Sequence, residues 1–341
     1  MSLPPNIYLK ENGFISCLIC SRRCRLKDGE VGFCGNKMAK TVSNELQIVF
    51  REVSKIEAFN IDPIEKKPLY HFYPGHSVLS LGLTGCNMEC FYCQNFKLSH
   101  DRLKFRYLYN ENNHYTRNIV NMLDSYNKNN QIIGVAFTYS EPSTWLEFMY
   151  PIATKVKEAG YNNIVVSNGM MSQKALDSLL PFIDVANIDV KSFQEKTYHS
   201  LGGKLKTVLT TIKRLYQTGV HIELTYLVVP ELNDDLDEIR NFVDWVQDSD
   251  VNIPIHFTRY FPSFKAYNSP TPLKTLIKSY DIAKDKLNHV YIGNILNHDY
   301  QTTYCPNCKS PIIKRNNLQV ENQIIKNRCA NCREYLYGIF R

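Results

Sequence analysis

Short apolar runs alternate with longer amphipathic stretches between residues 51 and 300 of the chain. The apolar runs are rich in β-branched residues and end at turn-forming ones, a pattern that predicts strands, whereas the amphipathic stretches predict helices. The predicted strands are 78–82, 132–137, 163–166, 185–189, 221–229 and 255–257, and the predicted helices are 143–159, 173–180, 205–218 and 236–247. Strands that alternate with helices form a parallel sheet with right-handed crossovers. Six such units predict an α/β fold, a partial (β/α)6 barrel.

Polar residues stand at or near the end of nearly every predicted strand. In barrels of parallel strands, the loops that follow the strands carry the functional residues. The residues concerned are Ser140, Glu141, Ser167, Asn168, Asp189, Lys191, Thr225 and His256. A carboxylate can accept from an ammonium group, a lysine can pair with a carboxylate, and an acid can hold a diol. Each residue alone has a structural explanation, such as a turn, an ion pair or a buried histidine, but their shared position favours a site for a zwitterionic ligand.

The loop after the first predicted strand carries Cys86, Cys90 and Cys93. Three thiolates at this spacing can hold one 4Fe–4S cluster and leave the fourth iron without a protein ligand, as catalytic metal sites keep one position open. The alternative is three reduced core cysteines that happen to lie close together. The loop is polar rather than apolar, and Gly82 and Gly85 precede it, so the sequence favours the cluster.

Eight further cysteines fall into two groups of four, one near each end of the chain, with none left over. The last group, within residues 301–341, is formed by Cys305, Cys308, Cys329 and Cys332. Its two Cys-x2-Cys knuckles predict a zinc ribbon, in which a β-hairpin joins the knuckles, with rubredoxin-like iron as the alternative. So small a module cannot fold on its own core, so we expect the metal to supply much of its stability.

The first group, within residues 1–50, is formed by Cys17, Cys20, Cys24 and Cys34. Its spacing suits structural zinc and suits equally a second 4Fe–4S cluster that relays electrons; zinc is slightly favoured. The total of eleven cysteines is odd and no export signal is evident, which argues against a disulfide framework. We therefore predict three parts: a metal-binding segment over 1–50, the barrel over 51–300, and a zinc-ribbon-like module over 301–341.

The run GLTGCNMECFYCQN around the central cysteines resembles the signature of the radical S-adenosylmethionine (radical SAM) enzymes, in which an aromatic residue such as Tyr92 typically precedes the third cysteine. The run NIDPIEKKPLYHFYPG, over residues 60–75, resembles the segment before the cluster in one subgroup. That subgroup is the AmmeMemoRadiSam radical SAM protein, akin to the pyruvate formate-lyase activating enzyme. The resemblance implies a 4Fe–4S cluster and SAM as cofactors. It implies reductive cleavage of SAM to a 5′-deoxyadenosyl radical that abstracts hydrogen from a substrate which the resemblance does not fix.

The resemblance also implies roles for individual residues. Glu141 matches the position that binds the SAM amino group. Ser167, Asn168, Asp189 and Lys191 match positions that hold the SAM carboxylate and ribose, and His256 matches a position beside the adenine. Tyr139 and Ser140 stand where the family has two glycines, so the backbone approach must differ there. Val166 replaces an acid of the activating enzyme, so the resemblance does not extend to a monovalent cation site.

The formal charge of +7 is concentrated in residues 17–40 and 303–341. Cations there can offset the negative charge of thiolate-bound metals, which we favour, or attract nucleic acid. Two other functions stay open: a glycyl-radical activase that acts on a partner protein, and a metal-stapled module that binds nucleic acid.

No apolar run approaches membrane-spanning length, which predicts a cytoplasmic protein with no membrane contact. Expected partners are a one-electron donor such as ferredoxin or flavodoxin and, by resemblance, Memo-like and AMMECR-like proteins; the substrate could be a small molecule, a protein or a nucleic acid.

Overall fold

A computed structural model describes residues 7–51, 56–100, 107–108, 114–127, 131–316 and 319–340. Its centre is an eight-stranded sheet in the order β14-β13-β12-β11-β10-β9-β7-β6. The strands are β6 (Ala58–Pro63), β7 (Ser77–Gly82), β9 (Ile132–Phe137), β10 (Asn162–Ser167), β11 (Val185–Asp189), β12 (His221–Val228), β13 (Ile255–Arg259) and β14 (Val290–Gly293). All neighbours pair in parallel except β6, which is antiparallel to β7. The predicted partial barrel is confirmed, with β14 and β6 added at its two edges.

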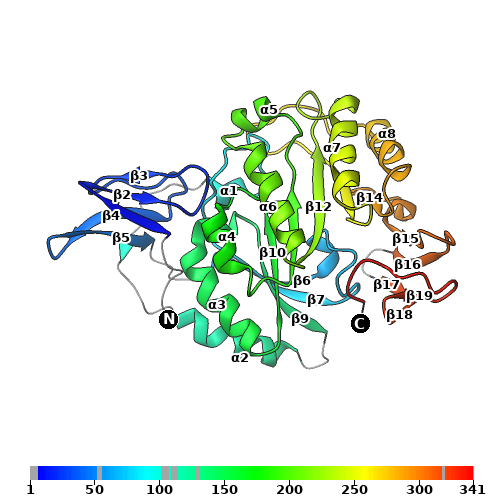
Figure 1. Cartoon of the computed structure of the whole chain (residues 1–341), viewed down its shortest axis with the longest axis horizontal. Helices are drawn as coiled ribbons and strands as arrows, with labels where there is room; N and C mark the ends of the chain where they lie inside the picture. Colours follow the sequence, from blue (N-terminus) through cyan, green and yellow to red (C-terminus); the bar gives the residue numbers. More distant parts are fainter. Residues whose placement is uncertain are drawn as a thin grey trace.

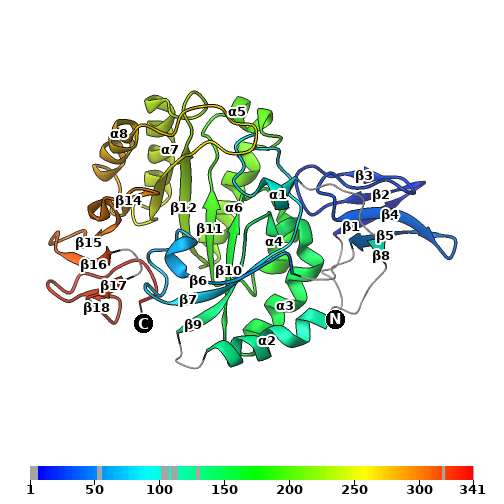
Figure 2. The ribbon, with the colours of Figure 1, turned by 180° about the vertical axis from the view of Figure 1, so that it is seen from behind.

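Helices follow the parallel strands and cover the outer face of the sheet (Figures 1 and 2). They are α2 (His114–Tyr126), α3 (Leu146–Glu158), α4 (Gln173–Leu179), α5 (Glu195–Ser200), α6 (Leu205–Gln217), α7 (Leu236–Ser249) and α8 (Leu273–Lys284). The four predicted helices correspond to α3, α4, α6 and α7. In the part of the chain that the structure describes, no helix is both long and apolar enough to span a bilayer.

Alternation along the strands sorts the core into an outer and an inner part. On β7, Leu79 and Leu81 pack with the helices in the large core, whereas Val78 points to a smaller inner cluster. That cluster also contains Ile64 and Phe72, which lie in the loop that includes η1 (Ile64–Lys66). Successive side chains of a strand face opposite ways, so Val78 faces the inside of the barrel while Leu79 faces the helices. The apolar loop packs against Val78 and fills the end of the barrel where the strands begin. The strand ends at the other edge stay free for polar groups.

Small strands flank the barrel at opposite sides (Figures 1 and 2). The N-terminal strands are β1 (Tyr8–Glu11), β2 (Phe14–Cys17), β3 (Arg25–Leu26), β4 (Lys37–Val42) and β5 (Glu45–Arg51), and β5 also pairs with β8 (Tyr107–Leu108). The C-terminal strands are β15 (Thr303–Tyr304), β16 (Pro311–Asn316), β17 (Gln319–Asn322), β18 (Ile324–Ile325) and β19 (Arg328–Cys329). The antiparallel pair β16–β17 is the hairpin predicted between the two C-terminal knuckles.

Candidate active site

Glu141 lies at the centre of the site, between the ends of two neighbouring strands. It is the N-cap of η2 (Pro142–Trp145), where Pro142 starts the helix. Its buried carboxylate accepts hydrogen bonds from the Ser143 backbone N–H (3.1 Å), the Ser167 hydroxyl (2.9 Å) and the Asn168 backbone N–H (2.9 Å). Burial raises the pKa of Glu141, although these hydrogen bonds act in the opposite direction. A carboxylate offers about four acceptor positions, so one remains for a cationic ligand.

Asn168 connects Glu141 to the cysteine loop. Its side-chain amide donates to Asn87 Oδ1 (2.8 Å) and lies 3.7 Å from Cys86 Sγ. Its own Oδ1 accepts from the Met170 backbone N–H (3.0 Å), which fixes the orientation of the amide. Because Asn87 directly follows Cys86, the end of β10 and the cysteine loop form one hydrogen-bonded unit. Three sequence-predicted residues, Glu141, Ser167 and Asn168, are thus brought together beside the first cysteine.

Tyr139 shows how the chain accommodates a bulky residue where the resemblance expects glycine. It has a φ of 73°, in the left-handed region that glycine favours. Its hydroxyl donates to Asp62 Oδ2 (2.7 Å), and Asn60 Nδ2 donates to the same hydroxyl (3.0 Å). Gly82 leaves room for the ring, since a Cβ there would lie 2.9 Å from Tyr139 Cδ2. These contacts offset the cost of the strained backbone, and the neighbouring Ser140 hydroxyl donates to the Leu83 carbonyl.

Asp189 and Lys191 form an ion pair at the end of β11, with 2.7 Å between Lys191 Nζ and Asp189 Oδ2. Burial alone would lower the pKa of Lys191, but the carboxylate of Asp189 and the nearby Cys90 raise it, so the ammonium stays charged. Tyr198 accepts the Lys191 backbone N–H (2.9 Å) and anchors this turn. The Asp189–Lys191 pair therefore places one cation and one anion beside the cysteine loop. The ring of Tyr92, within that loop, is buried and lies 6.3 Å from that of Tyr260, edge to face.

Thr225 and His256 lie in a different network, inside the barrel. Thr225 pairs with Asp189 in the β11–β12 register and with His256 in the β12–β13 register, so the three residues share a level. Yet the Thr225 hydroxyl donates to Asn187 Oδ1 (2.9 Å), and His256 Nε2 lies 2.7 Å from Glu223 Oε2. Within the described residues, none of the hydrogen bonds found for Thr225 and His256 leads to Glu141. Their contact with a ligand remains a prediction.

Glu223 is the centre of this second network and was given no role from the sequence. It is fully buried and accepts from the backbone N–H groups of Tyr70 (3.0 Å) and His71 (2.7 Å). Burial would raise the pKa of Glu223, but hydrogen bonds from His221 and His256 hold it well below its usual range. The signal was present in the sequence: His221, Glu223 and Thr225 alternate with apolar residues, which marks one polar face of a strand.

The three cysteine groups differ in how closely their sulfur atoms gather. In the C-terminal group all four lie within 4.8 Å of one another, with 3.5 Å between Cys305 and Cys332 Sγ and 3.7 Å between Cys308 and Cys329 Sγ. Four thiolates at roughly 2.3 Å from one tetrahedral ion lie at about these separations. Among the described residues, this is the only group of three or more such ligands close enough to hold a single ion.

A partial barrel with a three-cysteine loop after its first parallel strand defines the class of protein. Residues 81–245 match the model of the Radical SAM superfamily. The chain belongs to this superfamily and is a radical SAM enzyme, and membership implies a 4Fe–4S cluster and SAM as cofactors.

The chain is also similar to particular proteins. An uncharacterized protein of Methanocaldococcus jannaschii is 35% identical to the chain over 333 residues, 94% of each chain. The 7-carboxy-7-deazaguanine synthase of the same organism is 26% identical over 197 residues, which cover 51% of this chain and 76% of that one. The crystal structure of a radical SAM methyltransferase from Sphaerobacter thermophilus superposes with a TM-score of 0.53 at 12% identity, over 72% of each chain. This likeness concerns the fold alone.

Proposed function

We propose that the chain is a radical SAM enzyme of the AmmeMemoRadiSam type, in which Cys86, Cys90 and Cys93 hold the cluster. When bound, the cluster and SAM supply an electron and a 5′-deoxyadenosyl radical able to take a hydrogen atom from an unreactive carbon. The observation that carries the proposal is the carboxylate of Glu141, held by Ser167 and Asn168 within one hydrogen-bonded unit with the cysteine loop.

Each polar group has a task for which its surroundings suit it. The free acceptor position of Glu141 would take the SAM ammonium group, and Lys191 would pair with its carboxylate. Asp189 would accept from the ribose hydroxyls. His256, at the level of Asp189, would lie beside the adenine, with Thr225 next to it, while Ser140 and Tyr92 would shape the walls. The fixed ion pair and buried rings orient the ligand and exclude water rather than transfer protons.

The partners of the proposed enzyme follow from its electron balance and from the subgroup. Each cleavage of SAM consumes one electron, so a low-potential one-electron carrier such as ferredoxin or flavodoxin would deliver it. Memo-like and AMMECR-like proteins are the partners that the subgroup suggests.

At the C-terminal knuckles, the sulfur separations and tetrahedral donor set support zinc, with iron as the competing ion.

The test is production of 5′-deoxyadenosine by anaerobically reconstituted protein with a strong one-electron reductant. We expect slow production without substrate, because the reduced cluster and bound SAM suffice, and faster production with the true substrate. Replacing Cys86, Cys90 and Cys93 together by alanine should abolish it while C-terminal metal remains. Unchanged iron content and unchanged cleavage in that variant would contradict the assignment.

The substrate class is tested by following deuterium from a labelled substrate into 5′-deoxyadenosine. A substrate deuterated at the abstracted position must pass its label into 5′-deoxyadenosine, so labelled cell extracts can be fractionated on this signal. A label that comes from a protein fraction, once per chain, would favour the glycyl-radical activase. A label from a small molecule or a nucleic acid with repeated turnover would favour the AmmeMemoRadiSam type of enzyme.

A further inference from the structure

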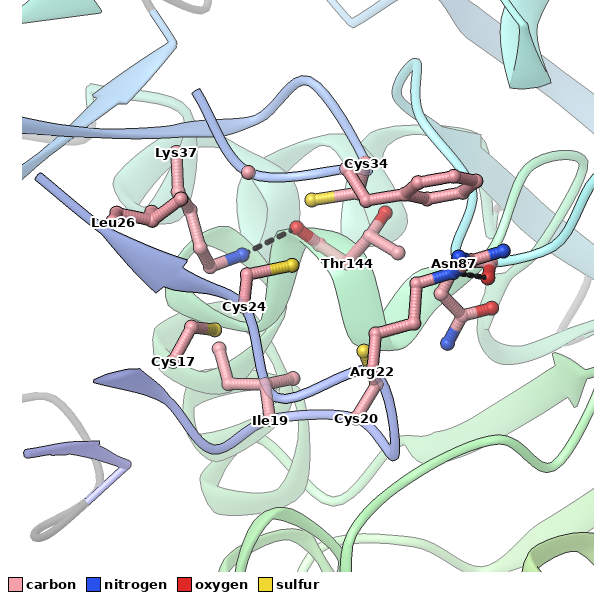
Figure 3. Close-up of a pocket in the computed structure, with 12 residues that line it drawn as sticks. Cys17, Ile19, Cys20, Arg22, Cys24, Leu26, Cys34, Lys37, Asn87 and Thr144 are labelled. Atoms are coloured by element: carbon pink, nitrogen blue, oxygen red, sulfur yellow. Dashed lines mark hydrogen bonds between the residues drawn. The ribbon is translucent and has the colours of Figure 1, made fainter. Parts of the chain in front are cut away.

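The four N-terminal cysteines line a single cavity (Figure 3). Cys17 ends β2, Cys24 directly precedes β3, and Cys34 lies three residues before β4, so each lies at or near the end of a different strand of the N-terminal sheets. Cys20 lies in the loop between β2 and β3, where it forms an isolated bridge with Met171 of the barrel. Apolar side chains complete the wall, among them Ile19, Leu26 and Phe33. The arrangement is a pocket lined by four thiols from one region of the chain, which is a donor set for a metal group.

The sulfur atoms of this pocket stand apart, in contrast to those of the C-terminal knuckles. Sulfur–sulfur contacts of 3.5 and 3.7 Å occur in the knuckles, whereas in the described chain no such contact joins the N-terminal cysteines. One tetrahedral zinc ion draws four thiolates into contact. A cubane cluster keeps them further apart, because each thiolate binds its own iron at a different corner. The spacing therefore fits a cluster with space between its ligands.

Two cationic side chains, Arg22 and Lys37, line the pocket. Lys37 is 2% exposed, and its ammonium donates to the Thr144 carbonyl (2.6 Å) and lies 3.2 Å from the Glu147 carboxylate. The Arg22 guanidinium lies over the Phe33 ring, 3.2 Å from its centroid. Four thiolates with any metal group carry net negative charge, which these cations would offset. The charges support a thiolate-bound metal group of either kind, and the lack of close sulfur contacts is what favours the cluster over a single ion.

The pocket also touches the loop of the central cysteines. Asn87, next to Cys86 in sequence, is part of the pocket wall, and its carbonyl accepts a hydrogen bond from Arg22 Nε (2.6 Å). Gly85, on the other side of Cys86, has a φ of 96°, and a Cβ there would lie 2.6 Å from the Cys34 carbonyl oxygen. The residues on both sides of Cys86 are thus packed against the N-terminal cysteine segment. Asn87 therefore belongs both to the wall of the pocket and, through Asn168, to the hydrogen-bonded unit around Cys86.

We propose that Cys17, Cys20, Cys24 and Cys34 bind a second 4Fe–4S cluster, which passes electrons to the central one. A low-potential one-electron carrier reduces the N-terminal cluster by one electron. That electron then reduces the central cluster, and the N-terminal cluster returns to its oxidised state. Zinc has no redox chemistry and could not serve this step. The relay rests on the proposed function, whereas the presence of the second cluster does not.

The presence of the N-terminal cluster is tested in the variant with Cys86, Cys90 and Cys93 replaced by alanine. This variant is reconstituted anaerobically with ferrous iron and sulfide. We expect about four iron and four sulfide per chain to remain, with the Mössbauer signature of a 4Fe–4S cluster. This measurement leaves the N-terminal segment unaltered, and Gly85 and Asn87, which pack against it, keep their sequence as well. Zinc at the N-terminal site, or no iron in this variant, would overturn the proposal. Either result would leave the central assignment standing.

The relay is tested with Cys20→Ser and Cys34→Ser combined, in protein that retains about four iron at the central site. With dithionite, which can reduce the central cluster directly, we expect 5′-deoxyadenosine production within about threefold of the wild type. With reduced flavodoxin we expect a loss of more than about tenfold, a barrier increase of roughly 1.4 kcal/mol. Equal rates for variant and wild type with flavodoxin would overturn the relay. Absence of cleavage in the wild type itself, with both reductants, would instead overturn the proposed function and the relay with it.

Discussion

The two groups of four cysteines at the ends of the chain offer the same ligands, but different parts of the structure hold their sulfur atoms in position. In the C-terminal group, Lys309 and Arg333 each follow the second cysteine of a knuckle in left-handed conformation, with φ of 57° and 64°. The backbone N–H of each donates to the carbonyl of its knuckle's first cysteine, at 3.0 Å in both. Two equivalent tight turns thus gather the four sulfurs. In the N-terminal group one thiol ends a strand and the other three lie in loops, so packing against the barrel decides their spacing.

The comparison shows that local turns bring the sulfur atoms together in the C-terminal group, whereas packing between distant segments places them in the N-terminal group. A Cys-x2-Cys knuckle fixes its own geometry within five residues. The N-terminal cysteines need Thr144 and Asn87, which belong to the barrel, to close their pocket. The C-terminal site should therefore depend on its metal for folding, whereas the N-terminal site should depend on its contact with the barrel.

The largest effect is expected from removal of the C-terminal metal. Cys329→Ser combined with Cys332→Ser should release about one metal ion per chain and unfold residues 303–340 locally, because structural zinc supplies roughly 10–16 kcal/mol in zinc-finger peptides. Metal analysis and amide hydrogen exchange measure both effects. Asn331→Ser, between the same two cysteines, is the control and should keep the metal. Full protection of this segment without metal would contradict the comparison.

Gly85→Ala tests the contact on which the N-terminal site depends. The left-handed φ costs an alanine about 1–2 kcal/mol, and the approach of Cys34 O and Asn36 Nδ2, 2.6 and 2.5 Å from the new Cβ, adds a further 1–3 kcal/mol. Gly219→Ala is matched to it, since Gly219 has a φ of +80° and nothing within 4 Å of the added Cβ. Denaturant unfolding and N-terminal iron content measure the difference. Equal losses in the two variants would show that the contact is unimportant.

Glu141→Ala should weaken SAM binding while leaving the terminal metals in place. The ammonium would lose a charge-assisted acceptor worth about 1.5–3 kcal/mol, one to two decades in affinity. Titration of SAM onto the reconstituted variant measures this, and iron analysis confirms that the central cluster still assembles. Glu158→Ala, at an exposed carboxylate at the end of α3, is the control. A wild-type dissociation constant for Glu141→Ala would reduce Glu141 to a structural role.

The smallest effect concerns pH at the side of the barrel that faces the C-terminal strands. Burial lowers the pKa of His289 to about 4, and its ring lies 4.3 Å from that of His71. The unfolded chain then binds a proton at higher pH than the folded one, so stability falls as pH decreases below about 6.5. Between pH 7 and 5.5 the loss should be about 1 kcal/mol. Denaturant unfolding at both pH values should show that loss reduced in His289→Leu; an unchanged pH dependence would contradict the assignment.

The sequence predicted the parallel strands well where they are fully buried. β9 reads IIGVAF with every side chain buried, and such a run leaves little choice of structure. β14, with four residues, and β6, whose central residues are exposed, carry too weak a pattern and were missed. At the site, Glu141, Ser167 and Asn168 could be grouped beforehand because each lies at or just after the end of a strand of one parallel sheet. The Glu223 network could not, since its donors Tyr70 and His71 come from a loop about 150 residues away in sequence.

The sequence by itself determined the class of protein, through the spacing of Cys86, Cys90 and Cys93, and the C-terminal knuckles, through two short repeats. These features are local, so a few residues of backbone fix their geometry. Only the tertiary structure decided how far apart the N-terminal sulfurs stand, that Tyr139 takes a left-handed conformation, and that His256 pairs with Glu223. Each of these depends on contacts between distant segments, because steric packing and burial of charge act between neighbours in space, whatever their separation along the chain.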